Sequence, residues 1–171
     1  MSKPLRHCCV PVSPRIHRCV KIGPGQKVGI IGLGGLGYMG VKFAKAMDAH
    51  VVMITTSPDK GKDADEILVS RDPAAMTKHA GSFDFLLNTI PVCHDANPYL
   101  GLLKLDGKMG MVGVLTELEP IVGANLIFGR KSMFGSGIGG MTETQEMLDF
   151  CGEHNIISDV KMIAIKDVNH A

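Results

Sequence analysis

The sequence predicts an α/β fold built around a mainly parallel β-sheet. Short apolar runs of strand length alternate along the chain with segments whose apolar residues recur at helical spacing, as in consecutive strand–helix–strand units. The first such run, residues 28–32, is apolar throughout and ends in glycine, which is typical of a parallel strand buried on both faces. These two observations set the fold class.

The expected elements begin after residue 27. About six main strands are predicted, at 28–32, 50–55, 66–69, 83–89, 108–115 and 132–137, with a last short strand at 161–165. The first helix is indicated by apolar residues at helical spacing: Met39, Val41, Phe43, Ala44 and Met47. Further helices are predicted at 73–79, 96–104 and 142–154. Asp72 and Pro73 suit the start of one helix, and Thr142-Glu143-Thr144-Gln145 has a capping-box pattern.

The length of 171 residues fits one domain with a substantial core. The net charge is +1 and the basic residues are scattered, so neither nucleic acid nor an acidic membrane surface is expected as a partner. No apolar run is long enough to span a bilayer, and residues 1–14 lack the apolar core of a signal peptide. We therefore expect a cytoplasmic protein.

A glycine-rich turn lies between the first predicted strand and the helix after it. Its sequence, Gly32-Leu33-Gly34-Gly35-Leu36-Gly37, contains the GxGxxG spacing of dinucleotide-binding folds. The first glycine permits a tight turn, the second lets the backbone approach a pyrophosphate, and the third lets helix and strand pack closely. A purely structural turn is the alternative. Because strand, turn and helix stand in the right order, we expect a Rossmann-like, doubly wound sheet that binds a dinucleotide at the helix N-terminus.

The end of the second strand indicates which dinucleotide is bound. An NAD site usually carries Asp or Glu about 20 residues after the glycines, where it bonds the ribose 2′-hydroxyl. Here the strand ends in Thr55, Thr56 and Ser57, and Lys60 follows. Hydroxyl groups and an ammonium suit a 2′-phosphate, which a carboxylate would repel. The sequence therefore favours NADP(H), while an ordinary surface role for Lys60 stays open and Asp59 lies in the same loop.

Four stretches carry a resemblance to a known family: 23–60, 81–90, 102–114 and 126–154, which cover well over half of the chain. They resemble the cofactor-binding domain of zinc-dependent medium-chain alcohol dehydrogenases, in the branch of the cinnamyl alcohol dehydrogenases and bacterial NADP-dependent aldehyde reductases. The resemblance implies an oxidoreductase that interconverts aldehydes and alcohols. It implies that the glycine turn holds the pyrophosphate and that the hydroxyl-plus-lysine segment holds the 2′-phosphate. It also implies contacts with the nicotinamide half from Thr89, Gly113, Ser136, Gly137 and Ile138.

Several features depart from the family pattern. The catalytic domain, with its zinc ligands and substrate pocket, is absent from this sequence, and residues 58–65 are too few for the usual helix between the second and third strands. We expect either a tight loop or a disturbed corner of the sheet there. We interpret 1–22 as an irregular lead-in, a remnant of the catalytic-domain junction, 23–160 as the NADP-binding domain, and 161–171 as a truncated return segment.

Cys8 stands 15 residues before Gly23, the offset of the family's third catalytic zinc ligand. The other ligands are missing, so Cys8 would be an orphan ligand, and a tail with free thiols is the favoured interpretation. A local site that adds the neighbouring histidines and cysteines follows no known zinc spacing. We expect this chain to bind no zinc.

Several functions fit these observations. The favoured one is the NADP(H)-binding half of an alcohol dehydrogenase, a fragment inactive alone because the zinc that stabilises the developing alkoxide is missing. His94, on a loop of unknown direction, is the one candidate for a replacement acid. In the family the sixth strand pairs with its copy, so residues 132–137 are expected to support a homodimer or pairing with an intact homologue. A non-catalytic binding module, a non-functional remnant and another Rossmann-like protein with an adenine ligand are the alternatives.

Overall fold

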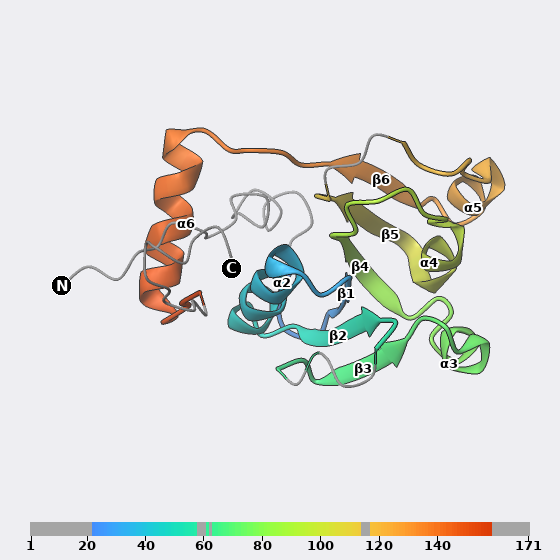
Figure 1. The fold of residues 1–171 in the computed structure, drawn as a ribbon, viewed down its shortest axis with the longest axis horizontal. Coiled ribbons are helices and arrows are strands. Elements are labelled where there is room, and N and C mark those ends of the chain that lie inside the picture. Colours follow the sequence, from blue (N-terminus) through green and yellow to red (C-terminus); the bar gives the residue numbers. More distant parts are fainter. Residues whose placement is uncertain (1–21, 58–60, 62, 114–116, 159–171) are drawn as a thin grey trace, which may run out of the picture.

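Six parallel strands form one sheet in a computed structural model, which describes residues 22–57, 61, 63–113 and 117–158 (Figure 1). The strands are β1 Lys27–Ile31, β2 His50–Thr55, β3 Glu66–Val69, β4 Phe83–Asn88, β5 Leu103–Met111 and β6 Ser132–Gly135. Their order across the sheet is β3-β2-β1-β4-β5-β6, and every neighbouring pair is parallel. This is the strand order of the Rossmann fold, which confirms the predicted fold class.

Helices cover both faces of the sheet. On one face lie α2, Gly35–Ala46, and α6, Met141–Glu153. On the other lie α3, Pro73–Lys78, α4, Asn97–Leu102, and α5, Gly123–Ile127. Each face has its own apolar core, so the sheet separates two buried layers. None of the described helices is long and apolar enough to cross a membrane.

Strands β2 and β3 have the predicted limits. Strand β1 begins and ends one residue earlier than predicted, β4 ends one residue earlier, and β6 ends at Gly135 rather than at residue 137. Two other regions differ more. The helix expected at 96–104 ends at Leu102, and β5 begins at Leu103 rather than at Lys108, because Leu103 pairs with Phe83 ahead of an irregularity in the β4–β5 register. Helix α5 was not predicted, since five residues are too few to show a helical period. The expected strand at 161–165 lies outside the described residues.

The two expected helix starts have different outcomes. The Asp72 side chain accepts a hydrogen bond from the Ala74 N–H at 2.9 Å, so the predicted N-cap is confirmed. The capping box predicted at Thr142 is wrong, because α6 begins earlier and Gly140 is its N-cap. The Glu143 carboxylate reaches back to accept from the Gly140 N–H at 3.1 Å, and the Thr144 hydroxyl donates to the Gly140 carbonyl oxygen at 3.0 Å.

A short link joins β2 to β3 without disturbing the sheet. The two strands keep a regular parallel register from Val52 opposite Glu66 to Thr55 opposite Val69. Asp65 ties the link to the start of β2: its backbone N–H donates to the Val51 carbonyl oxygen, and its carboxylate accepts from the Val51 N–H, both at 2.9 Å. Lys45, at the end of α2, forms an ion pair with the same carboxylate at 3.0 Å. Of the two expected outcomes, a disturbed corner of the sheet is not what the described residues show, since the β2–β3 pairing is regular.

Gly61 lets this link lie close against β2. Its φ is +104°, a conformation that L-residues rarely adopt, and an added Cβ would lie 2.8 Å from Met53 Cγ. Met53 belongs to the core on the α2 face. The backbone at Gly61 therefore lies against core surface beside β2.

We expect Gly61→Ala to lower the free energy of unfolding by about 1–3 kcal/mol, because it combines backbone strain with a close contact to Met53. Chemical denaturation measures this change. Gly101→Ala is the matched control, since no atom lies within 4 Å of its added Cβ and it lies in α4, where the change should be neutral or stabilising. Equal stability of Gly61→Ala and the unmodified chain would contradict the close packing of the link.

A polar cluster lies at the amino-terminal edge of the sheet. The His79 ring lies between Lys27 and Glu66: Lys27 Nζ is 3.1 Å from His79 Nδ1, and His79 Nε2 is 3.2 Å from Glu66 Oε1. Lys27 Nζ is also 3.4 Å from Glu66 Oε2, and His50 Nε2 lies 3.6 Å from the same oxygen. Burial, and then the Lys27 ammonium, lower the pKa of His79 below its ordinary value of 6.5, against the opposite effect of Glu66.

This shift makes stability depend on pH. The folded protein favours neutral His79, whereas the unfolded chain takes up the proton near pH 6.5. The stabilisation from His79 is therefore present above pH 6.5 and decreases as the pH falls below it. Thermal unfolding from pH 7.5 to 5 should show a loss that His79→Gln reduces and that the control His154→Gln retains. An identical pH profile for His79→Gln and the unmodified chain would contradict the assignment.

Candidate functional site

The glycine turn lies between β1 and α2 at the carboxyl edge of the sheet. Gly32 has φ +90°, and its N–H donates to the Ile54 carbonyl oxygen of the neighbouring strand at 3.1 Å. At Gly37 an added Cβ would overlap the Gly32 carbonyl oxygen, so the first turn of α2 rests directly on the strand end. Both glycines are required by the backbone path, as the sequence pattern predicted.

The start of α2 is open in front of the turn. Gly34 is the N-cap of this helix in an extended conformation, Gly34 and Gly35 are exposed, and an added Cβ at either position meets no side chain or neighbouring backbone of the described residues within 4 Å. No acidic residue lies in the first helical turn. The first N–H groups of a helix have no partner within the helix and carry partial positive charge. This end of α2 is therefore suited to an anionic group that approaches the backbone closely.

Thr89, directly after β4, is hydrogen-bonded to the glycine turn. Its side chain is almost completely buried at the end of β4. Its hydroxyl lies 2.9 Å from the Ile31 carbonyl oxygen and 3.0 Å from that of Gly32, and donates to them. The Thr89 N–H donates to the Ile31 carbonyl oxygen at 2.9 Å. The hydroxyl of this expected nicotinamide-side residue thus fixes the position of the glycine turn.

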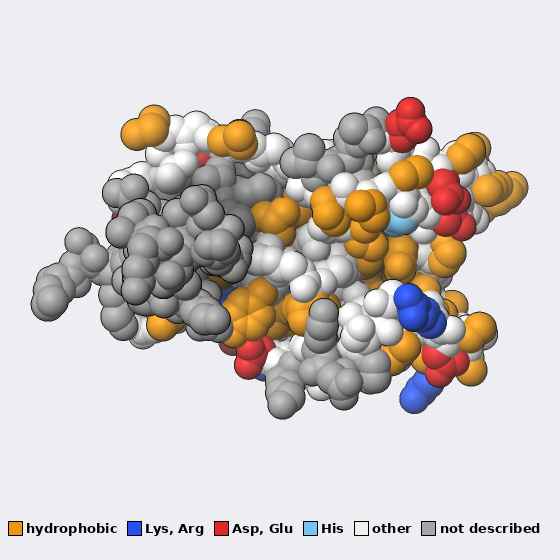
Figure 2. Space-filling view, in the orientation of Figure 1, with side chains coloured by type: hydrophobic (Ala, Val, Ile, Leu, Met, Phe, Trp, Pro, Cys, Tyr) orange, Lys and Arg blue, Asp and Glu red, His pale blue; other side chains and the backbone are white. Residues whose placement is uncertain are grey.

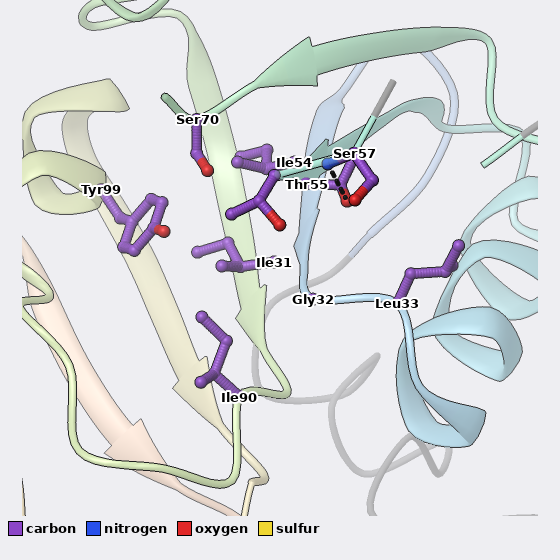
Figure 3. A pocket seen from close by; sticks show the side chains of 10 residues that line it. Ile31, Gly32, Leu33, Ile54, Thr55, Ser57, Ser70, Ile90 and Tyr99 are labelled. Carbon is purple, nitrogen blue, oxygen red and sulfur yellow. Dashed lines mark hydrogen bonds between the residues drawn. The ribbon is translucent and has the colours of Figure 1, made fainter. Parts of the chain in front are cut away.

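A pocket of about 190 Å³ opens beside the turn, at the carboxyl ends of β1 and β2 (Figure 3). It is lined by Ile31, Gly32, Leu33, Ile54, Thr55, Thr56, Ser57, Ser70, Ile90 and Tyr99. Tyr99 and Ile90 lie on one side in Figure 3, and Ser57 and Leu33 on the other. Four aliphatic side chains and one aromatic ring form about half of its lining, and hydroxyl groups gather where β2 ends. A flat apolar group with a polar attachment fits such a lining.

The end of β2 carries only hydroxyl side chains among its described residues. Thr55 is buried, and its hydroxyl oxygen accepts from the Ser57 N–H at 3.2 Å, which shapes the turn after the strand. Thr56 is exposed and Ser57 half-buried beside the pocket. Asp59 and Lys60 lie outside the described residues. The part that is described contains no carboxylate at this strand end.

The residues expected near the nicotinamide fall into two groups. Gly113 packs against the loop after β4, where an added Cβ would overlap the Ile90 carbonyl oxygen, and its N–H donates to the Asn88 carbonyl oxygen at 3.3 Å. Thr89 and Gly113 are thus brought together at the carboxyl edge. Ser136 continues the β5–β6 ladder through its N–H, which donates to Met111 at 3.0 Å. Gly137 and Ile138 extend beyond β6 with exposed side positions, Ile138 being 92% exposed.

Several residues of this edge were missed by sequence reasoning. Ser70, Ile90 and Tyr99 line the pocket, although they come from three segments with no common motif. Asn88 is completely buried at the end of β4, and its amide contacts His94. A polar residue that closes an apolar strand was the one available signal for Asn88.

Comparison with known proteins places these features in a family. A model of the zinc-binding dehydrogenase family matches residues 35–153. The chain belongs to the zinc-binding dehydrogenases. Among the curated proteins, this dehydrogenase chain is 49% identical to aldehyde reductase YahK of Escherichia coli over 156 residues, which cover 87% of the chain and 44% of that protein. It is 46% identical to a probable mannitol dehydrogenase of Medicago sativa, over 86% of the chain and 43% of that protein.

Solved structures of the same kind superpose closely on this dehydrogenase chain. A cinnamyl alcohol dehydrogenase from Sorghum bicolor matches with a TM-score of 0.88 and 39% identity, over 94% of the chain and 47% of the solved chain. The cinnamyl alcohol dehydrogenase of Helicobacter pylori, solved in complex with NADP(H), matches with a TM-score of 0.81 and 32% identity, over 95% and 48%. The chain thus spans about half the length of the relatives it matches.

The name of the family raises the question of whether this chain holds a metal. Within the described ranges, no group of three or more His, Cys, Asp or Glu side chains is placed to hold a metal ion. Cys8, the orphan ligand suggested by the resemblance, lies outside those ranges. The described residues do not fit zinc, and no metal-dependent step follows from them.

The two kinds of glycine in the turn should respond differently to a methyl group. Gly37→Ala forces the first turn of α2 away from Gly32, and we expect it to lower the free energy of unfolding by about 1–3 kcal/mol, the usual cost of a strained or overpacked position. Gly34→Ala has free space in an extended conformation, so its stability should stay within about 0.5 kcal/mol of the unmodified chain. Chemical denaturation of both variants checks this, and equal losses would contradict the described turn.

Proposed function

We propose that this chain binds NADP(H) at the carboxyl edge of its sheet. The observation that carries the proposal is the open N-terminus of α2, held against β1 by Gly37 and Thr89 and flanked by the 190 Å³ pocket. In this proposal the backbone of Gly32–Gly37 binds the pyrophosphate, which would face N–H groups at the positive end of the helix. Leu33 and Leu36 supply further backbone N–H groups of the same turn.

The pocket takes the adenosine half of the cofactor. An adenine ring is flat and mostly apolar, so it can lie among Ile54, Ile90 and Tyr99, while its ribose reaches the hydroxyl groups of Thr55 and Ser57. The pocket lies directly beside the glycine turn and shares Gly32 and Leu33 with it. One ligand that joins an aromatic base to a pyrophosphate therefore fits both features.

The 2′-phosphate would be bound by Thr55, Thr56, Ser57 and Lys60. Hydroxyl groups and backbone N–H groups can donate to a phosphate, and an ammonium adds charge compensation. An NAD-type carboxylate at this position would instead accept from the ribose 2′-hydroxyl and repel the phosphate. The hydroxyl groups that the structure places at the end of β2 support NADP(H) over NAD(H).

We expect NADPH to bind more tightly than NADH, by about tenfold or more, since one charge-assisted contact is worth about 1.5–3 kcal/mol. Isothermal titration calorimetry of the 171-residue chain measures both affinities. Ser57→Asp and Lys60→Glu should each narrow or reverse the preference, whereas Lys78→Glu, on exposed α3, should leave it unchanged. Gly34→Ala should weaken the binding of both cofactors without lowering the free energy of unfolding of the chain. Equal affinity of the unmodified chain for the two cofactors would contradict the assignment.

For the protein as a whole we propose alcohol–aldehyde interconversion with NADP(H), an activity to which this chain contributes the cofactor half. Thr89, Gly113 and the segment Ser136-Gly137-Ile138 would lie on the nicotinamide side. The binding unit would extend over residues 23–160, between the lead-in 1–22 and the return segment 161–171. The sequence relationship to an aldehyde reductase and to alcohol dehydrogenases supports this assignment.

A second proposal concerns self-association through residues 132–137. Strand β6 is the last strand of the described sheet, so its outer edge is available to another strand. Exposed apolar side chains adjoin it: Ile127 is 73% and Phe128 86% exposed in and after α5, where hydrophobic groups gather on the surface in Figure 2. Strand addition by a second copy, or by an intact homologue, would cover this edge.

The N–H of Ser136 faces β5, so alternation along the strand turns that of Gly135 outward. Gly135→Pro removes an outward donor and should shift the chain towards the monomer in sedimentation velocity runs. Gly135→Ala, with no atom within 4 Å of its Cβ, is the control and should keep the association. A chain that is monomeric before substitution would contradict this proposal.

A further inference from the structure

The loop after β4 is held by the buried side chain of the last residue of that strand. Asn88, the last residue of β4, is completely buried. Its Oδ1 accepts from the Ile90 N–H at 3.1 Å, and its Nδ2 lies 2.8 Å from Nε2 of His94. The Nδ1 of His94 lies 2.7 Å from the Val92 carbonyl oxygen. Two side chains thus connect the end of a core strand to the loop that forms one wall of the pocket.

The partners leave one arrangement of hydrogens. The Ile90 N–H can only donate, so the Asn88 oxygen faces it and the Asn88 amide NH₂ faces His94. The Val92 carbonyl oxygen can only accept, so His94 Nδ1 carries the hydrogen and donates. His94 Nε2 must then accept from Asn88. The two contacts thus fix the tautomer of the ring, with the hydrogen on Nδ1 and the acceptor at Nε2.

The network reaches both ends of the proposed cofactor site. Ile90, whose N–H it holds, lines the pocket, and the ring of His94 lies edge-on to Tyr99, with centroids 6.3 Å apart. On the other side, the Asn88 backbone carbonyl accepts from the N–H groups of Val112 and Gly113 at 3.0 and 3.3 Å. Tyr99 and Gly113, which come from different elements, are thus both set relative to Asn88.

We propose that Asn88 and His94 are positioning residues for NADP(H): the hydrogen bond from the Asn88 amide to His94 Nε2 holds Ile90 and Tyr99 as the preformed wall of the adenosine pocket. The inference rests on the proposed function. Both ring nitrogens of His94 have partners within this network. His94 is therefore assigned a positioning role here rather than the role of a replacement acid. A preformed wall raises the affinity for the cofactor, because binding then does not carry the entropic cost of ordering the wall.

The two polar atoms of the histidine ring can be replaced separately. In His94→Gln the side-chain carbonyl oxygen takes the place of Nε2 and can still accept from Asn88. In His94→Asn the amide reaches only the place of Nδ1, so the bond to Val92 can form while Asn88 Nδ2 is left buried without its partner. The pair therefore isolates the Asn88 bond. Cys93→Ser, an exposed position on the same loop, is the control for changes to the loop itself.

We expect His94→Asn to weaken NADPH binding about three- to tenfold in calorimetry, the size of one neutral hydrogen bond. His94→Gln should restore affinity to within about twofold, and Cys93→Ser should bind like the unmodified chain. NADH affinity should fall by the same factor, because the wall does not contact the 2′-phosphate. Equal NADPH affinity of His94→Asn and the unmodified chain, or failure of His94→Gln to restore it, would overturn the proposal.

A measurement without cofactor separates this inference from the proposed function. Amide hydrogen exchange of the ligand-free chain should show faster exchange at Ile90 in His94→Asn and unchanged exchange in His94→Gln, with β1 and β2 unaffected in both. Unchanged exchange at Ile90 in His94→Asn would overturn the positioning role even if NADPH binds. Absence of NADPH binding by the unmodified chain, with the expected exchange pattern, would overturn both the proposed function and the role of the wall in it, while the Asn88–His94 contact itself would stand.

Discussion

The backbone contact between Gly37 and the Gly32 carbonyl group determines how α2 meets β1. It requires glycine at both positions, at Gly32 for its φ of +90° and at Gly37 for the missing Cβ. Thr89 completes the arrangement, since one buried hydroxyl lies within hydrogen-bond distance of the carbonyl groups of Ile31 and Gly32. The turn is thereby fixed to two strands, and the open N-terminus of α2 points beyond the edge of the sheet.

The short link after β2 joins two parallel strands, and its described residues contain no helix. A parallel crossover usually needs an element to cover the face that it passes, because the strands are buried on both sides. Here Asp65 closes the connection through two hydrogen bonds to Val51 and an ion pair to Lys45, and Gly61 brings the backbone against Met53. The N–H of Val51 also lowers the pKa of Asp65, which favours the charged form that makes these contacts.

Much of the fold was predictable because its determinants are local. The apolar runs gave the strands, and the glycine spacing located the turn, since each depends on residues close in sequence. Helix α5 was not predictable, because it is too short to show a helical period. The early start of β5 was not predictable either, because it depends on pairing with Phe83. The start of α6 was misplaced because a glycine N-cap has no side chain to signal it.

The candidate site likewise has parts that were predictable from the sequence and parts that were not. Thr89 and Gly113 were named from the family resemblance, and the structure gives them a physical setting at the turn and beside Ile90. The wall of the pocket was not foreseen, because Ser70, Tyr99 and the Asn88–His94 contact depend on the tertiary arrangement of separate loops. Periodicity and motif spacing carry no information on such contacts.

Hydrogen–deuterium exchange of the chain with and without NADPH tests the central claim most directly, because it reports where the ligand binds rather than only that it binds. We expect slower exchange on NADPH addition in the segments 32–38, 54–57 and 88–99, with no change at His79, which lies at the amino-terminal edge of the sheet. Protection confined to other segments, or no protection at the glycine turn under saturating NADPH, would contradict it.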